Sequence, residues 1–145
     1  MRVVLQRVLS ASVEAEGKVT GSIGKGYVAL LGVGKGDTRE TAVKMAEKIA
    51  RLRLFADSGG KTNLSAADVG GALLAVSQFT LYADCSKGHR PSFTGAAEPA
   101  EARALYEAFI AECKRLFGKV ESGVFGADMK LSLVNDGPFT MCLEM

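Results

Sequence analysis

One short stretch of this chain, GYVALLGVG at residues 26–34, restricts the fold more than any other. The run is apolar throughout, has the length of a strand and is bounded by glycines. Strands with one solvated face alternate apolar and polar residues, whereas strands buried on both faces do not. We therefore predict that residues 26–34 form a central strand in the middle of a sheet.

Further strands are predicted before and after it. Residues 10–24, SASVEAEGKVTGSIG, alternate around Glu16-Gly17-Lys18 in a pattern typical of a hairpin with a tight glycine turn. The polar, glycine-rich stretch 57–71 is expected to be a loop that leads into an apolar strand, ALLAVSQF, at 72–79. Alternation on both sides of NDGPFT, residues 135–140, predicts two closing strands.

Two segments have the periodicity of amphipathic helices. In the first, Asp37 and Glu40 have the spacing of a capping box, and apolar residues then recur at helical intervals up to residue 52 or 53. The second begins near Pro99, because proline is tolerated in the first turn of a helix. Its apolar face comprises Leu105, Tyr106, Phe109, Ile110, Cys113 and Phe117. Residues 1–145 are therefore expected to form a single α+β domain, with a largely antiparallel, barrel-like sheet and two packed helices.

Length and composition limit the environment of the protein. A chain of 145 residues can bury a core without disulfides or metals, and its three cysteines are too scattered for a disulfide framework. The N-terminal run MRVVLQRV is too short for a signal peptide. The longest uncharged stretch, residues 70–83, is shorter than the roughly 20 residues of a membrane helix. These features favour a cytoplasmic protein with reduced thiols and no membrane contact.

The charge balance bears on nucleic-acid binding. The net charge is only +2, so long-range attraction to phosphates would be weak and any contact with nucleic acid would be local. Lys87, His89 and Arg90 form the densest basic segment, in the glycine-containing stretch SKGHR. Charge alone favours an ordinary solvated loop there.

Several catalytic arrangements are absent from the sequence. His89 is the only histidine, so a histidine-based triad is not expected. Cysteines and histidine do not have the spacing of a metal site, and we expect neither a metal nor another cofactor. GVGKGDT, residues 32–38, lacks the spacing of a nucleotide-binding loop and is interpreted as the turn into the first helix.

Polar residues gather where the strand at 72–79 ends, in SQFTLYAD. Ser77, Gln78 and Thr80 could line a cleft at this strand end. Backbone N–H groups there could bind a developing oxyanion, with Gln78 as an additional donor, which is the main requirement of acyl transfer. From these residues alone, a polar strand exit without catalytic function is the better interpretation.

NDGPFT, at residues 135–140, interrupts the alternation near the C-terminus. Pro138 cannot donate to a sheet ladder, and Gly137 has access to backbone angles that other residues avoid. The local sequence predicts a hairpin turn with a trans bond, since only about 5–6% of X–Pro bonds in folded proteins are cis.

Four stretches taken together resemble the D-aminoacyl-tRNA deacylase family: SQFTL at 77–81, KGHRPSFTGAAEP at 87–99, GVFGADMKLSLVNDGP at 123–138, and NDGPFT. The resemblance begins at MRVVLQRV and covers essentially the whole chain. It implies a homodimeric hydrolase that cleaves the ester between an amino acid and the 3′-terminal adenosine of tRNA. D-aminoacyl esters, and glycine mischarged on tRNA(Ala), would be substrates, and L-aminoacyl esters would be spared.

The resemblance also implies how chirality is read. Each active site would lie at the subunit interface, where Gly137-Pro138 of one subunit, joined by a cis bond, enters the site of its partner. The main chain of this dipeptide would collide with an L-side chain. Arg7 would hold the Gly-Pro carbonyls in orientation. The alternative for Arg7 is an ordinary surface charge on the first strand.

Further residues are assigned to substrate binding by the same resemblance. Phe125 and Met129 match positions that flank the adenine in the family, although their residue types alone suit a core. Lys87 and Arg90 of the basic loop would contact the tRNA.

For catalysis, the resemblance implies a site formed by Ser77, Gln78, Phe79 and Thr80. N–H groups of Phe79 and Thr80 would stabilise the oxyanion, while the 2′-hydroxyl of the terminal adenosine helps to activate water. Thr80 as a covalent nucleophile is a rival, but the sequence provides no base for it. Two other classes stay open: a non-catalytic RNA-binding dimer that uses the basic loop, and a general esterase or peptidase that uses Thr80 or Ser77.

Overall fold

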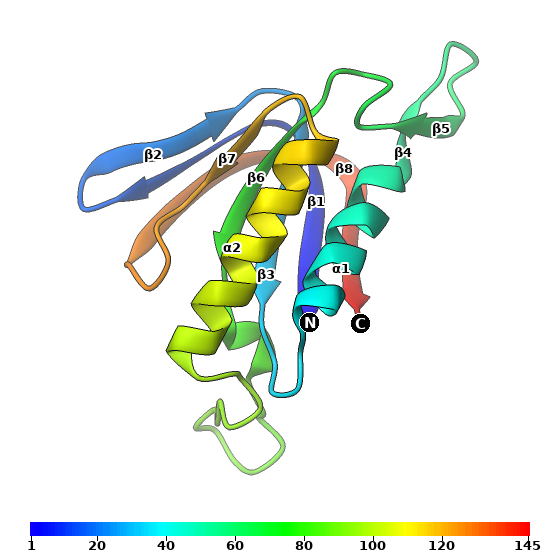
Figure 1. The fold of residues 1–145 in the computed structure, drawn as a ribbon. Helices are drawn as coiled ribbons and strands as arrows, with labels where there is room; N and C mark the ends of the chain where they lie inside the picture. Colours follow the sequence, from blue (N-terminus) through cyan, green and yellow to red (C-terminus); the bar gives the residue numbers. More distant parts are fainter.

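The computed structural model describes all 145 residues. Its elements form two layers, with a sheet on one side and two helices packed against one of its faces (Figure 1). In chain order the elements are β1 (Arg2–Ala15), β2 (Lys18–Ile23), β3 (Gly26–Gly32), α1 (Arg39–Arg51), β4 (Arg53–Ala56), β5 (Thr62–Ser65), β6 (Ala72–Ser77), the 3-10 helix η1 (Phe79–Tyr82), α2 (Pro99–Leu116), β7 (Val120–Ser122) and β8 (Met129–Glu144).

The main sheet has the strand order β2-β1-β3-β6-β7, and β8 pairs with the other edge of β1 along its length. β1 is antiparallel to β2, β3 and β8, whereas β3–β6 and β6–β7 are parallel. β2 contacts β7, which brings the two ends of the strand order together (Figure 1). The predicted α+β domain with a barrel-like sheet and two helices is confirmed.

The central position of β3 is also confirmed. It lies between β1 and β6, and all of its residues except Leu30 are buried. Tyr27 packs on the helix side of the sheet, in one apolar cluster with Ile49 of α1 and Phe109 of α2. Its neighbour Val28 belongs to a second apolar cluster on the opposite face. Complete burial of a side chain such as Phe109 contributes about 1.5–3 kcal/mol, so both helices are held by their apolar stripes.

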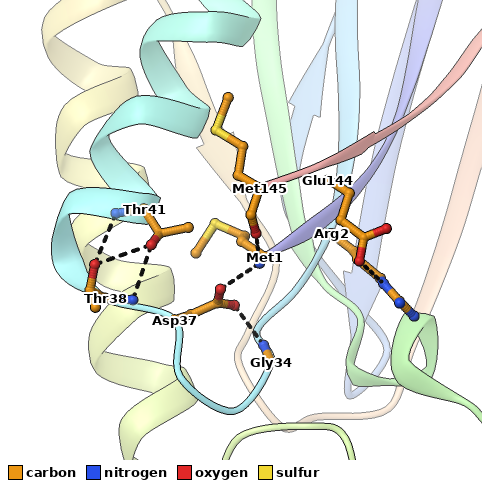
Figure 2. Close-up of polar contacts among 8 residues, drawn as sticks. All are labelled: Met1, Arg2, Gly34, Asp37, Thr38, Thr41, Glu144 and Met145. Atoms are coloured by element: carbon orange, nitrogen blue, oxygen red, sulfur yellow. Dashed lines mark hydrogen bonds and ion pairs between the residues drawn. The ribbon is translucent and has the colours of Figure 1, made fainter.

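The start of α1 differs from the predicted capping box. Thr38 is the N-cap: its hydroxyl accepts from the Thr41 N–H at 3.2 Å, and its own N–H donates to the Thr41 hydroxyl at 3.2 Å (Figure 2). Asp37 is engaged elsewhere, because its carboxylate accepts from the N–H of Gly34 at 2.7 Å and from the ammonium of Met1. The helix therefore begins one residue later than the sequence pattern indicated.

The stretch 57–71, predicted as a loop, contains β5, which pairs with β4 in a small separate sheet. Asp57 closes the turn between them, since its carboxylate accepts from the N–H groups of Gly59 at 2.9 Å and Lys61 at 3.0 Å. These bonds stabilise the ionised form and hold the pKa of Asp57 below its usual value. The predicted loop is wrong for residues 62–65, because the turn at Asp57 brings them back to pair with β4.

The predicted pair of closing strands is one strand, β8, with an irregularity at NDGPFT. Asn135 pairs with Val8 and Thr140 pairs with Gln6, so four residues of β8 bulge out opposite Arg7. The chain does not reverse there, because β1 offers a pairing edge on both sides of the bulge. Neither α1 nor α2 combines the length and the hydropathy that a membrane-spanning helix requires.

Candidate functional site

A cavity of about 580 Å³ opens beyond the carboxyl end of β6. Its wall is largely apolar and is built by β3, the end of β6, the start of η1, α2, and the segment that leads into β8 together with the first residues of that strand. A concave apolar cavity with few polar groups is the usual form of a small-ligand site. The cavity brings together five residues of the predicted site: Ser77, Gln78, Phe79, Phe125 and Met129.

The polar wall of the cavity is the junction between β6 and η1. Ser77 is the last residue of β6, and the N–H of Gln78 extends the parallel ladder by donating to the carbonyl of Leu31 at 2.7 Å. The chain then turns into η1, whose first two residues are Phe79 and Thr80. The first N–H groups of a helix have no acceptor within the helix, so those of Phe79 and Thr80 are available as donors. Phe79 lines the cavity, whereas Thr80, the next residue, does not.

The rest of η1 is satisfied internally. The N–H of Leu81 donates to the carbonyl of Gln78 at 3.3 Å, and that of Ala83 donates to the carbonyl of Thr80 at 3.0 Å. The Gln78 side-chain amide donates to the hydroxyl of Thr80. An amide is not a base, so this contact does not activate the Thr80 hydroxyl as a nucleophile.

The opposite wall is formed by α2 and the approach to β8. The ring of Phe125 lies 5.8 Å from that of Tyr106, and the guanidinium of Arg103 lies 5.2 Å from the centre of the Phe125 ring. Tyr106 is predicted from sequence only as part of the apolar face of the second helix, and it also lines the cavity. Its hydroxyl donates to the carbonyl of Ala75 at 2.9 Å, and burial raises its pKa. Its place on the apolar stripe of α2 gave no signal that it also lines the cavity.

The basic loop that follows η1 lies beyond the carboxyl end of β6 (Figure 1). Its base is closed by an antiparallel bridge between Asp84 and Ser92. The N–H of Asp84 donates to the carbonyl of Ser92 at 2.7 Å, and the N–H of Ser92 donates to the carbonyl of Asp84 at 2.9 Å. Lys87, His89 and Arg90 are exposed within it. None of the three lines the cavity.

The Gly137-Pro138 bond is cis and lies in the bulge of β8. The start of β8 lines the cavity, but Gly137 lies further along that strand. There β8 is next to β1, and β1 and β3 lie between it and β6. With strands about 4.8 Å apart and about 3.3 Å per residue, Gly137 is on the order of 20 Å from Ser77 of the same chain. A single chain therefore does not bring these two parts of the predicted site together.

Arg7 is buried, and the interpretation of an ordinary surface charge is wrong. It is 9% exposed, and its Nε lies 2.9 Å from the carboxylate of Asp136 and donates to the carbonyl of that residue at 3.1 Å. Nη1 donates to the carbonyl of Leu54, and the guanidinium lies 4.1 Å from the centre of the Phe139 ring. Within one chain, Arg7 thus holds the residue before Gly137 rather than the Gly-Pro carbonyls.

The sequence carries a signal for this burial. Val3, Leu5 and Arg7 occupy alternate positions of β1, and the first two are buried on the helix-facing side. Because side chains two apart share a face of a strand, an arginine in phase with buried aliphatic residues indicates a buried cation.

Sequence comparison assigns the class to which this arrangement belongs. The profile of the family described as D-Tyr-tRNA(Tyr) deacylase matches residues 4–144. A D-aminoacyl-tRNA deacylase of Thermosipho africanus is 56% identical over 99% of this chain and 97% of its own length. One of Rhodopirellula baltica is 50% identical over all of both chains. The chain belongs to the D-aminoacyl-tRNA deacylase family.

Solved structures agree with this fold. A structure titled c-Myc DNA Unwinding Element Binding Protein superposes with a TM-score of 0.94 at 37% identity, covering 100% of this chain and 99% of the other. A second, titled as a probable eukaryotic D-amino acid tRNA deacylase, has a TM-score of 0.83 at 19% identity, over 99% and 98% of the two chains. The second shows likeness of fold alone.

Proposed function

We propose that this chain hydrolyses the ester bond of D-aminoacyl-tRNA in the cavity beyond β6. The observation that carries the proposal is the junction at Gln78, where helix-start N–H groups lie at the edge of an apolar cavity. Family membership and full-length identity above 50% to named deacylases support the same reaction. Because aminoacyl-tRNA is used in translation, we expect the protein to act in the cytoplasm.

The chemistry follows from the donors at this junction. Attack of water on the ester carbonyl creates an oxyanion, which the N–H groups of Phe79 and Thr80 stabilise as fixed dipoles. Ser77 and Gln78 complete the polar wall. The 2′-hydroxyl of the terminal adenosine assists water, since it is held next to the ester by the substrate itself. No side-chain base is required because an aminoacyl ester is already activated.

The adenosine itself fits the apolar part of the cavity. The half-buried side chains of Phe125 and Met129 offer an aromatic face and a polarizable thioether to the adenine. Lys87 and Arg90 are exposed beyond the same strand end, where they contact phosphates further along the tRNA.

Selection against L-substrates requires a second copy of the chain. The cavity of one chain contains no main-chain group from Gly137-Pro138, which lies on the order of 20 Å away. In a homodimer with active sites at the interface, this turn of the partner enters the cavity and screens the α-carbon of the substrate. D-aminoacyl esters and glycine, including glycyl-tRNA(Ala), are accepted, and L-side chains collide with the main chain.

Binding of nucleic acid without catalysis is the second candidate. It is favoured by one observation, the 0.94 TM-score and 37% identity to a structure whose title names a DNA-binding protein. The two candidate functions are distinguished by whether the protein hydrolyses aminoacyl-tRNA or only binds it.

The test is incubation of the protein with matched D-tyrosyl-tRNA and L-tyrosyl-tRNA, alongside a Gln78→Ala variant. We expect hydrolysis of the D-form at least about 100-fold faster than the L-form, and a loss of activity in the variant. Equal rates for the two enantiomers would refute the chiral screen. Binding of both forms without hydrolysis of either would favour the second candidate.

A further inference from the structure

The C-terminal end of η1 is held by Arg2, at the beginning of β1. Nη1 of Arg2 donates to the carbonyl of Leu81 at 3.2 Å, and its guanidinium lies 4.6 Å from the centre of the Tyr82 ring. Leu81 and Tyr82 are the last two residues of η1. The final carbonyls of a helix lack partners within it and carry partial negative charge, so a cation at this point both satisfies and stabilises the helix end.

Arg2 is itself oriented by the opposite end of the chain. Its Nε lies 3.0 Å from the Glu144 carboxylate, and the two residues are register partners across β1 and β8 (Figure 2). Because the guanidinium presents donors on several edges, it bonds Glu144 and Leu81 at the same time. The end of η1 is thereby connected to the strand framework of the sheet.

Two glycines, Gly32 at the end of β3 and Gly34 just after it, allow η1 to pack closely against this part of the chain. A methyl group built on Gly32 would lie 2.9 Å from the carbonyl oxygen of Gln78 and 3.2 Å from Cβ of Leu81. One built on Gly34 would overlap the ring of Tyr82. Gly32 at the end of β3 therefore permits close approach to the Gln78 main chain, and Gly34, two residues further on, leaves room for the Tyr82 ring. Gly32 and Gly34 of GVGKGDT, a stretch interpreted from sequence as the turn into the first helix, thus have an additional packing function.

We propose that Arg2, Glu144, Gly32 and Gly34 form a cradle that positions η1 for the deacylation reaction, with Arg2 as the positioning residue. Arg2 acts at the end of η1 away from the substrate, whereas Gly32 lies against the Gln78 carbonyl at its start. Together they fix the direction of the N–H groups at the start of the helix. The inference rests on the proposed function, in which those N–H groups bind the oxyanion.

Because the ion pair of Arg2 and Glu144 is exposed, its effect on the position of η1 can be distinguished from an effect on the stability of the whole fold. The side chains of Arg2 and Glu144 are 42% and 67% exposed, and ion pairs of this kind contribute little to the free energy of unfolding. Oxyanion donors act within a narrow range of distances, and a displacement of about 1 Å at a reacting group can cost on the order of 100-fold in rate. Loss of Arg2 should therefore reduce turnover far more than stability.

The experiment compares Arg2→Met, Arg2→Lys and the control Arg115→Met. Arg115 is exposed and forms an ion pair with Glu112 on α2, so its removal matches the loss of charge without touching η1. With D-tyrosyl-tRNA as substrate, we expect Arg2→Met to lower kcat about tenfold or more and to change KM by less than about threefold. Arg2→Lys should recover part of the rate because it keeps the charge and one donor, and Arg115→Met should match the unsubstituted protein.

A second measurement, made without substrate, follows amide hydrogen exchange at Leu81 and Ala83, whose N–H groups close η1. Exchange at both should be at least about tenfold faster in Arg2→Met, while amides of β6 stay unchanged. Unchanged exchange at Leu81 and Ala83, or a kcat equal to that of the unsubstituted protein, would overturn the cradle. Full activity of Gln78→Ala would instead contradict the proposed site, since exchange in η1 does not depend on it.

Discussion

The guanidinium of Arg7 lies 2.9 Å from the Asp136 carboxylate and 3.1 Å from its carbonyl, so β1 fixes the chain immediately before Gly137. Asn135 acts from the other side, since its side-chain amide donates to the carbonyl of Arg7 at 2.9 Å and to that of Phe139 at 3.3 Å. The bulge that carries Gly137-Pro138 is thus held at both of its ends.

Replacing Arg7 should destabilise the fold. Arg7→Met leaves the half-buried Asp136 carboxylate and the Leu54 carbonyl without their partner, and a lost hydrogen bond to a charged group costs about 1.5–3 kcal/mol. Urea denaturation measures the free energy of unfolding. Asp136→Asn should cost less, because its carbonyl still accepts from Arg7. A loss below about 1 kcal/mol in Arg7→Met would mean that the pair is replaceable by water.

Gly137→Ala should impair activity without impairing the fold. A methyl group built on Gly137 would meet only the Asn135 side chain, at 3.5 Å, and Gly137 does not have a positive φ. The added methyl would stand beside the carbonyls that we propose face the substrate of a second copy, so turnover of D-tyrosyl-tRNA should fall at least about tenfold. The melting temperature and the mass in solution serve as controls. Undiminished turnover would place the chiral screen elsewhere.

Side-chain bases and nucleophiles should prove dispensable. Thr80→Ala removes a hydroxyl that contacts only an amide, and His89→Ala removes an exposed ring outside the cavity. Both variants should keep rates within about tenfold of the parent, whereas a tRNA ending in 2′-deoxyadenosine should react at least about 100-fold more slowly. The three rates come from one deacylation assay. Abolished turnover in Thr80→Ala would restore the nucleophile mechanism.

Only two of the three thiols should be reactive in the folded protein. Cys85 and Cys142 are exposed, whereas Cys113 is buried in α2, and burial raises the pKa of its thiol. A raised pKa lowers the thiolate fraction, which is the reactive form. Titration with a chromogenic disulfide should therefore count two fast thiols in buffer and three in guanidinium chloride. Three fast thiols in buffer would contradict the packing of α2.

Stability should fall at alkaline pH. Burial raises the pKa values of Tyr27 and Tyr106 above the ordinary 10.0, and the nearby Arg7 opposes part of the effect at Tyr27. Above pH 10 the unfolded chain gives up these protons while the folded chain keeps them, so the stability present below that pH is lost as the pH rises. Urea midpoints between pH 8 and pH 11 measure the slope. Tyr106→Phe should reduce this slope, and an equal slope in the variant would contradict the cause.

Sequence periodicity was sufficient to predict the elements that pack against many apolar side chains. β3 and the buried faces of α1 and α2 follow from patterns of 2.0 and 3.6 residues, because any apolar neighbour satisfies them. The start of α1 did not follow, since it depends on Asp37 being taken by Met1, which is distant in sequence. Polar contacts have specific partners, and a local pattern does not identify them.

The candidate site was predictable to a different degree. The residue types of Ser77, Gln78 and Thr80 indicated a polar strand end, and the resemblance to deacylases added Phe125 and Met129. Their convergence on one cavity required the parallel pairing of β3 with β6 and the return of β8 past α2. Arg2 was missed because nothing near it in sequence belongs to η1.

The contact between the two chain ends has a consequence for protein engineering. The ammonium of Met1 lies 2.6 Å from the carbonyl of Met145, and the N–H of Met145 lies 3.0 Å from the carbonyl of Met1 (Figure 2). A short linker could join them in a circular permutant, with new ends in the exposed turn at 58–60. Such a linker would convert the ammonium into an amide and cancel the charge that Asp37 binds at 2.5 Å. Asp37→Asn should therefore stabilise the permuted protein, in which the carboxylate has lost its cationic partner. The same substitution should destabilise the original chain, because it removes the ion pair with the Met1 ammonium.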